Sequence, residues 1–140
     1  MFNLDDCIAY ITCRGSKVLA ERLEKRLAPW DITRVQWIAL YYIGFNEAIT
    51  QKQLADRMAL KEPTVVRLLD RMEKEGFVVR EGSESDKRVK NINLTDKGST
   101  LNYELREVAE QFKNDAIKDI SDEDLSVFNS VLARMIENTK

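Results

Sequence analysis

Basic side chains recur on one side of a predicted helix between residues 62 and 75, and they are the groups in this chain best suited to binding chemistry. The polar face of that helix consists of Thr64, Arg67, Asp70, Arg71 and Lys74, with Val66 beside it. A second basic pair, Lys87 and Arg88, follows in the segment GSESDKRV. Guanidinium and ammonium groups bind phosphates, and guanidinium groups also form paired hydrogen bonds with guanine. These residue types favour nucleic-acid binding over catalysis.

Catalytic chemistry lacks its usual residues here. The chain has no histidine, which removes the commonest general base, the commonest metal ligand and the usual partner of a nucleophilic serine or cysteine. The five glycines are scattered singly, so no Gly-rich phosphate loop is present. Cys7 and Cys13 would lie about 120° apart around a helix axis, too far to pair locally or to share a metal. We therefore expect no enzyme, no cofactor and no metal site.

Length and charge indicate one cytoplasmic domain. A chain of 140 residues with 44% hydrophobic content can bury a core of its own. The longest uncharged stretch, 35–46, is far shorter than the roughly 20 apolar residues of a membrane span, and the amino terminus is acidic where a signal peptide is basic. The net charge is −2, but residues 50–90 hold 10 Lys and Arg against 8 Asp and Glu. The positive excess therefore lies in the middle of the chain.

The elements that position the basic residues follow from caps and periodicity. A helical stripe over residues 4–28 is interrupted near Gly15 and ends before Pro29. Two capping boxes, each a threonine with a glutamine three residues later, predict helices over 33–45 and 50–58. The next helix begins near Pro63, buries one face and stops at Gly76; the apolar positions of that face are Val65, Leu68, Leu69 and Met72.

The two middle helices have the lengths of a helix-turn-helix, with the small Ala55 where close packing is needed. Strand candidates over 77–81 and 90–94 predict a hairpin with a long loop directly afterwards. A helix-turn-helix followed by a hairpin is a winged helix, whose second helix enters the major groove of DNA while the loop contacts phosphates or the minor groove. Lys87 and Arg88 suit that loop, and Asp86 is placed to orient the guanidinium of Arg88.

The two ends of the chain predict long amphipathic helices. Thr95 and Ser121 are N-cap candidates for the last two, and both helices have wide apolar sides. Such helices pack on each other, and more fully across a dimer. The fold class we predict is mainly α with a small β-hairpin: a winged helix-turn-helix with amino- and carboxy-terminal dimerisation helices.

The segment TQKQLADRMALKEPTVVRLLDRMEKEGFVVREGSESDKRVKNINLTDKG, Thr50 to Gly98, closely resembles the winged helix-turn-helix of the MarR family of bacterial transcriptional regulators. LLDRMEKEGFVVR, the DKR wing tip and LTDKG are each typical of that family, in order and spacing. The resemblance implies one MarR-type domain over 1–140, with a DNA-binding part at 33–98 and dimerisation helices at 1–30 and 99–140. It also implies a cytoplasmic homodimer that binds a pseudo-palindromic operator, as a repressor released by a small aromatic or phenolic ligand.

The resemblance places nine residues at the DNA. They are Glu62, Pro63, Thr64, Val66, Arg67 and Arg71 on the recognition helix, and Asp86, Lys87 and Arg88 at the wing tip. Two positions depart from the pattern of many members. Lys61 replaces a capping serine, and Val66 replaces a polar contact residue but would suit a thymine methyl. The operator sequence is therefore open, while the mode of binding is predicted.

Ligand-binding residues are expected where the dimerisation and DNA-binding parts meet. Aromatic walls with guanidinium groups could hold a carboxylate or phenolate there, and the candidates are Tyr10, Arg14, Trp30, Arg34, Trp37 and Tyr41. The same aromatic residues, four apart on a helix, also suit a plain core. Two different functions stay open for the chain as a whole: a thiol-based redox regulator acting through Cys7 or Cys13, and a winged-helix module that binds a protein partner.

Overall fold

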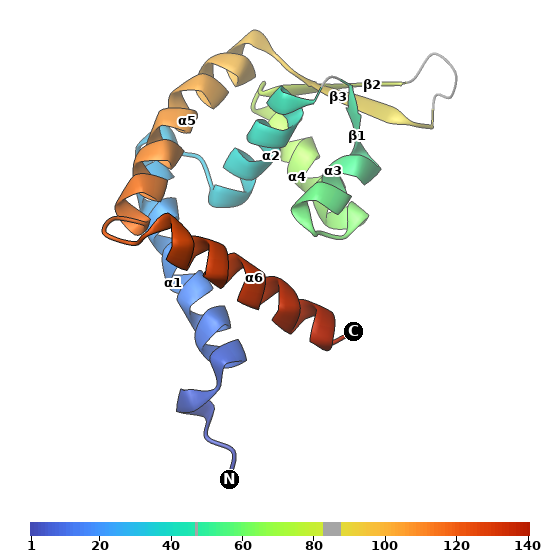
Figure 1. The fold of residues 1–140 in the computed structure, drawn as a ribbon. Helices are drawn as coiled ribbons and strands as arrows, with labels where there is room; N and C mark the ends of the chain where they lie inside the picture. Colours follow the sequence, from blue (N-terminus) through green and yellow to red (C-terminus); the bar gives the residue numbers. More distant parts are fainter. Residues whose placement is uncertain (47, 83–87) are drawn as a thin grey trace.

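The computed structural model describes residues 1–46, 48–82 and 88–140. Figure 1 shows a small antiparallel sheet beside short helices, with longer helices on the other side of the molecule, so the predicted winged-helix fold is confirmed. The elements in chain order are α1 (Ile8–Leu27), α2 (Arg34–Phe45), β1 (Ile49–Thr50), α3 (Gln51–Met58), α4 (Glu62–Lys74), β2 (Val78–Gly82), β3 (Lys90–Leu94), α5 (Asp96–Ala116) and α6 (Asp122–Asn138). Short 3-10 turns, Leu4–Asp6 and Ala28–Trp30, flank α1.

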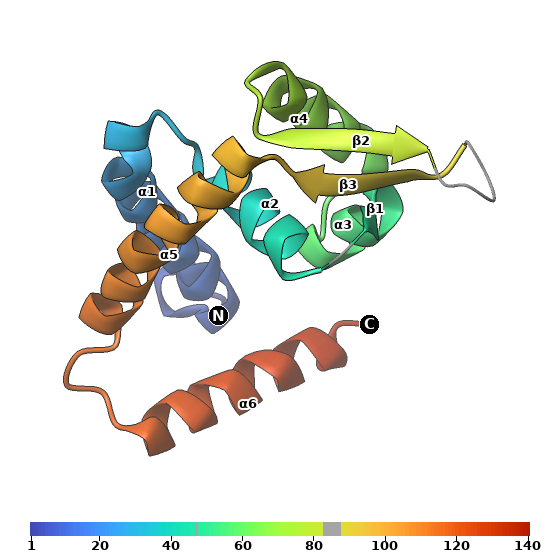
Figure 2. The same cartoon turned by 90° about the horizontal axis from the view of Figure 1, so that it is seen from above.

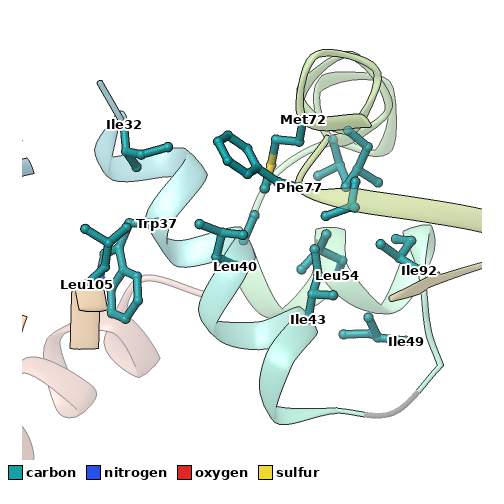
Figure 3. Close-up of a cluster of buried hydrophobic side chains, with 14 of the residues drawn as sticks. Ile32, Trp37, Leu40, Ile43, Ile49, Leu54, Met72, Phe77, Ile92 and Leu105 are labelled. Atoms are coloured by element: carbon teal, nitrogen blue, oxygen red, sulfur yellow. The ribbon is translucent and has the colours of Figure 1, made fainter. Parts of the chain in front are cut away.

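The hydrophobic core lies between the helix-turn-helix and the sheet (Figure 3). Leu40 of α2, Leu54 of α3, Leu69 of α4 and Ile92 of β3 are fully buried. Leu105 extends this core to α5, where it lies close to Trp37 in Figure 3. Complete burial of a large aliphatic side chain contributes about 1.5–3 kcal/mol, so these residues fix α4 relative to the rest of the chain.

The predicted helix starts are confirmed. Thr33 and Thr50 each form a full capping box, in which the threonine oxygen accepts from the backbone of the glutamine three residues later and that glutamine's side chain accepts from the threonine N–H. Thr95 and Ser121 cap α5 and α6 through their side-chain oxygens. These bonds satisfy N–H groups that the first turn of a helix leaves free, so the chain can begin each helix at a defined residue.

The sheet contains one strand that the sequence did not predict. β1 pairs with β3, Ile49 lying opposite Ile92, while β3 also pairs with β2 in the order β1-β3-β2. Two residues are too few to show the alternation by which strands are recognised, and Thr50 also serves as the cap of α3.

The LTDKG segment joins the end of α4 to the start of α5. The Thr95 hydroxyl donates to the Gly76 carbonyl over 2.6 Å, and the Lys97 ammonium donates to the Glu75 carbonyl over 2.9 Å. Gly76 has a φ of 84°, a left-handed conformation that suits glycine at a helix end. A Cβ on Gly98 would overlap the Phe77 carbonyl oxygen, so this position admits only a hydrogen. The helix-turn-helix and α5 are therefore tightly connected.

The amino-terminal helix corrects one expectation. α1 runs without interruption through Gly15, where an added Cβ would meet no atom within 4 Å. A single glycine lowers helix stability by only about 1 kcal/mol, which neighbouring turns can compensate. Near its carboxyl end α1 lies against α5, where the Arg26 guanidinium pairs with the Asp115 carboxylate at 2.8 Å and lies 5.2 Å from the centroid of the Phe112 ring.

The last helix stands apart from the winged helix (Figures 1 and 2). α6 has no buried residue, and its apolar side chains Val127, Phe128, Val131 and Ile136 are exposed. Apolar residues of α1, among them Ile8, Ile11, Val18 and Leu19, are exposed as well. Both terminal helices thus present apolar surface that this chain does not cover.

Candidate nucleic-acid interface

The turn between α3 and α4 sets the angle of the second helix. Ala59 ends α3 in the left-handed region with a φ of 55°, and the Leu60 N–H returns to the Ala55 carbonyl at 3.0 Å. Ala55 itself is buried, as the predicted close packing requires. Three residues separate Met58 from the start of α4 at Glu62, so the predicted helix-turn-helix is present.

One face of α4 is core and the other is open. Val65, Leu69 and Met72 are completely buried. Of the six residues predicted to contact DNA on this helix, five are exposed and one, Val66, is half-buried; the exposed residues are Glu62, Pro63, Thr64, Arg67 and Arg71. The helix therefore brings all six to the surface opposite its core face. Lys61 at the N-cap position makes no side-chain cap bond, so α4 begins without the side-chain cap that α2 and α3 have.

The two arginines of this face differ in their surroundings. Within the described part of the chain no carboxylate pairs with Arg67. Arg71 instead forms an i,i+4 ion pair with Glu75, Nε to Oε1 at 3.1 Å, although its side chain is 68% exposed. The other oxygen of Glu75 accepts from the Gln36 amide at 3.4 Å. The guanidinium of Arg67 is thus available for paired hydrogen bonds, whereas that of Arg71 is directed along the helix.

A charged cluster that the sequence did not predict connects the wing to the recognition helix. Arg80 of β2 contacts Asp70 of α4 (Nη2 to Oδ1, 2.6 Å), Glu73 of α4 (Nε to Oε2, 3.3 Å) and Gln51 of α3 (Nη1 to Oε1, 3.2 Å). Its side chain is only 16% exposed. The hydrogen bond from Arg80 lowers the pKa of Glu73. Burial works against the charge of Arg80, but its bonds to Glu73 and Asp70 outweigh this and raise its pKa.

The wing is a regular hairpin at its base. β2 and β3 pair antiparallel from Val78 opposite Leu94 to Gly82 opposite Lys90. Arg88 lies exposed just before β3. The predicted contact residues Asp86 and Lys87 lie outside the described residues, so the predicted pairing of Asp86 with Arg88 stays a prediction. In Figure 1 the paired strands β2 and β3 extend away from α5.

Comparison with known proteins identifies the family to which the chain is similar. The model of the MarR family matches residues 30–89, the helix-turn-helix and most of the wing. A solved structure of the transcriptional repressor CouR bound to a 23-mer DNA duplex is 25% identical, covers 95% of this chain and 94% of its own, and superposes with a TM-score of 0.85.

Two further solved structures agree over the same length. The S. aureus MepR–DNA complex is 24% identical, covers 94% of this chain and 98% of its own, and has a TM-score of 0.87, which shows a shared fold. A protein of unknown function from Listeria innocua Clip11262 is 30% identical over 94% of this chain and 91% of its own, with a TM-score of 0.73.

The chain belongs to the MarR family. Members of this family are transcriptional regulators and not enzymes, so the protein is a DNA-binding transcriptional regulator. Among the described residues of this MarR-family chain, no group of three His, Cys, Asp or Glu side chains could hold a metal. No helix in the same ranges has the length and hydrophobicity that a membrane crossing requires.

The six predicted ligand residues do not line one hollow in the single chain. Tyr10 and Arg14 line a hollow along the amino-terminal half of α1, and Arg34 lines another between α1 and the start of α2. Trp37 and Tyr41 line a third, of about 390 Å³, between α2 and α5. Trp30 instead contacts α5, where its indole N–H donates to the Glu104 carboxylate at 3.2 Å.

The α2–α5 hollow contains two residues that the sequence pattern did not indicate. Arg106 lies 5.7 Å from the centroid of the Tyr41 ring, and Lys113 lines the hollow further along α5. Only the helical spacing of α5 together with its packing on α2 brings these cations to the aromatic side chains. Both cysteines are free; Cys13 is exposed and Cys7 is half-buried at the start of α1.

Proposed function

We propose that this MarR-family protein is a cytoplasmic homodimeric repressor that binds a pseudo-palindromic operator and leaves it when a small aromatic or phenolic ligand binds. The observation that carries DNA binding is the open face of α4, with Arg67 unpaired among the described residues beside an amino terminus without a side-chain cap. Arg67 contacts a base, Arg71 contacts a phosphate, and the wing tip with Asp86, Lys87 and Arg88 contacts the backbone or the minor groove.

The dimer is supported by the uncovered apolar sides of α1 and α6. A monomer leaves these apolar side chains exposed to water. The same helices of a second copy would cover them and so remove them from water. In this arrangement residues 1–30 and 99–140 form the dimerisation part, and residues 33–98 form the DNA-binding part. Two copies of α4 would then enter successive major grooves, about 10 to 11 base pairs apart.

The ligand site we propose is the hollow between α2 and α5. Trp37 and Tyr41 supply aromatic walls, while Arg106 and Lys113 supply cations for a carboxylate or phenolate. CouR from Rhodococcus jostii RHA1 has been solved bound to p-coumaroyl-CoA, which supports a responsive regulator. A ligand that spreads α2 from α5 would also move the helix-turn-helix, because Leu105 and Trp37 belong to one core.

The experiment that tests this function is selection of DNA from a randomised pool by the wild type, Arg67→Ala and Arg71→Ala proteins. We expect a symmetric site for the wild type, relaxed preference at symmetric positions for Arg67→Ala, and weaker binding with unchanged preference for Arg71→Ala. Retention of no DNA at any salt concentration would contradict the proposal and favour a protein partner. Addition of phenolic carboxylates to the selected complex should release the DNA from the wild type but not from Arg106→Ala.

A further inference from the structure

The first turn of α4 contains a hollow that the general binding mode does not explain. Four side chains line it: Glu62, Pro63, Val66 and Arg67. They occupy two neighbouring rows of the helix, because residues four apart lie one above the other. The open space is about 590 Å³, and its two apolar lining residues are Pro63 and the half-buried Val66.

The two opposite charges that line this hollow favour a neutral occupant over a phosphate. Glu62 and Arg67 both line it, and their charges of opposite sign sum to zero. A phosphate would be repelled by the Glu62 carboxylate, and a purely apolar partner would leave both charges without water. A base edge fits better, since it has hydrogen-bond donors and acceptors beside apolar groups.

Thymine is the base whose major-groove edge carries an apolar group, the C5 methyl. Residues of the first turn of a recognition helix are those that contact base edges. We infer that Val66 and Pro63 receive the methyl group of a thymine in each half-site, next to a guanine that accepts paired hydrogen bonds from Arg67. This specificity rests on the proposed function, because it requires α4 to lie in the major groove.

Adjacency of the two bases follows from the geometry of the helix. Val66 and Arg67 are consecutive, so their Cα atoms differ by a rise of about 1.5 Å and a rotation of about 100°. Neighbouring base pairs are about 3.4 Å apart, a distance that two such side chains span. The selected operator should therefore contain a thymine in the base pair beside the guanine, on either strand.

Uracil provides the test, because it differs from thymine only by the C5 methyl. The selected duplex is synthesised with uracil at that single thymine of each half-site, and in a second duplex with uracil at a thymine elsewhere. One buried methyl group corresponds to about a fourfold change in affinity per half-site, or roughly fifteenfold for a dimer on two half-sites. The wild type should bind the first duplex that much more weakly and the second with unchanged affinity.

Protein variants identify the residue responsible. Val66→Ala should reduce the ratio of thymine-duplex to uracil-duplex affinity, whereas Val79→Ala, the same change at an exposed valine of β2, should keep the wild-type ratio. Thermal melting of each variant confirms that the proteins are folded. Three outcomes would overturn the inference. The wild type could bind the thymine and uracil duplexes equally, Val66→Ala could keep the wild-type ratio of the two affinities, or the selected site could lack the adjacent thymine. If the wild type selects no duplex from the pool, the proposed function is wrong, and this inference fails with it.

Discussion

Arg80 of the wing and Asp70 of the recognition helix lie 2.6 Å apart, Nη2 to Oδ1, in a position where the arginine also reaches Glu73 and Gln51. One side chain thereby joins β2, α4 and α3. Two carboxylates on α4, the helix that we propose faces DNA, would repel phosphates, and Arg80 neutralises part of that charge. The cluster accounts for how an acidic pair can be present on this helix without preventing binding.

Replacement of Arg80 should weaken DNA binding more than it changes the fold. Lysine keeps the charge but not the planar fork, so Arg80→Lys should lose some of the bonds and bind DNA a few-fold more weakly; Arg80→Met leaves both carboxylates unpaired and should lose about tenfold or more. Titration of the selected duplex at two salt concentrations measures this. Arg22→Lys, at an exposed arginine of α1, is the matched control. Wild-type affinity in Arg80→Met would show that the cluster does not position the wing.

The pKa of Glu73 predicts an acid-sensitive contribution to stability. Because Arg80 holds this pKa below its ordinary value in the folded chain, the contribution is fully present above the unfolded-state pKa and is lost as the pH falls through the folded-state value. Asp115, whose pKa is lowered by the Arg26 hydrogen bond, acts in the same direction. Between about pH 5 and pH 3 the melting temperature of the wild type should therefore fall more steeply than that of Glu73→Gln. Equal slopes would contradict the prediction.

Alanine substitutions at Gly98 and Gly15 should have opposite effects on the stability of the fold. Gly98→Ala places a methyl group against the Phe77 carbonyl and should cost about 1–3 kcal/mol, the usual range for overpacking. Gly15→Ala adds a methyl in open space inside α1 and should stabilise the chain by about 0.5–1 kcal/mol through backbone entropy. Urea unfolding of both proteins gives the two values. A destabilised Gly15→Ala would indicate that another chain packs closely there.

Local signals predicted most of the fold. The caps at Thr33, Thr50, Thr95 and Ser121 act within one helical turn, so a sequence window of four residues contains the whole interaction. The buried face of α4 follows in the same way from its helical period. These features need no knowledge of the remaining chain.

Features that depend on distant segments were not predictable in the same way. The partners of Arg80 come from α3 and α4. The local sequence, an arginine after two valines, does not indicate these partners. The proposed ligand residues show the same difficulty: Trp37 shares its hollow with Arg106 of α5, whereas Tyr10 and Arg34 line other hollows. A pattern along one helix gives a side chain's face but not the element that packs against it.

A charge on the apolar side of α6 should separate the proposed dimer. Phe128 is 57% exposed, and no residue of α6 is buried, so Phe128→Glu leaves the core of its own chain unchanged. We expect a folded monomer or a strongly weakened dimer by light scattering, together with lower DNA affinity because each half-site is then bound separately. Ser130→Glu, at an exposed polar position of the same helix, is the control for added charge alone. Wild-type dimers in Phe128→Glu would place the interface elsewhere.

The wing can be tested separately from the recognition helix through salt dependence. If Arg88 contacts one phosphate in each protomer, Arg88→Ala removes two counterion-release events per dimer, and the slope of log affinity against log salt should decrease by about 1.8. Because a phosphate contact carries no base information, the loss should be similar for the selected duplex and for an unrelated one. Arg67→Ala should behave differently, losing affinity mainly for the selected duplex. An unchanged salt slope with intact affinity in Arg88→Ala would place this residue outside the interface, and the affinity of the wing for DNA would then have to come from other residues of the hairpin.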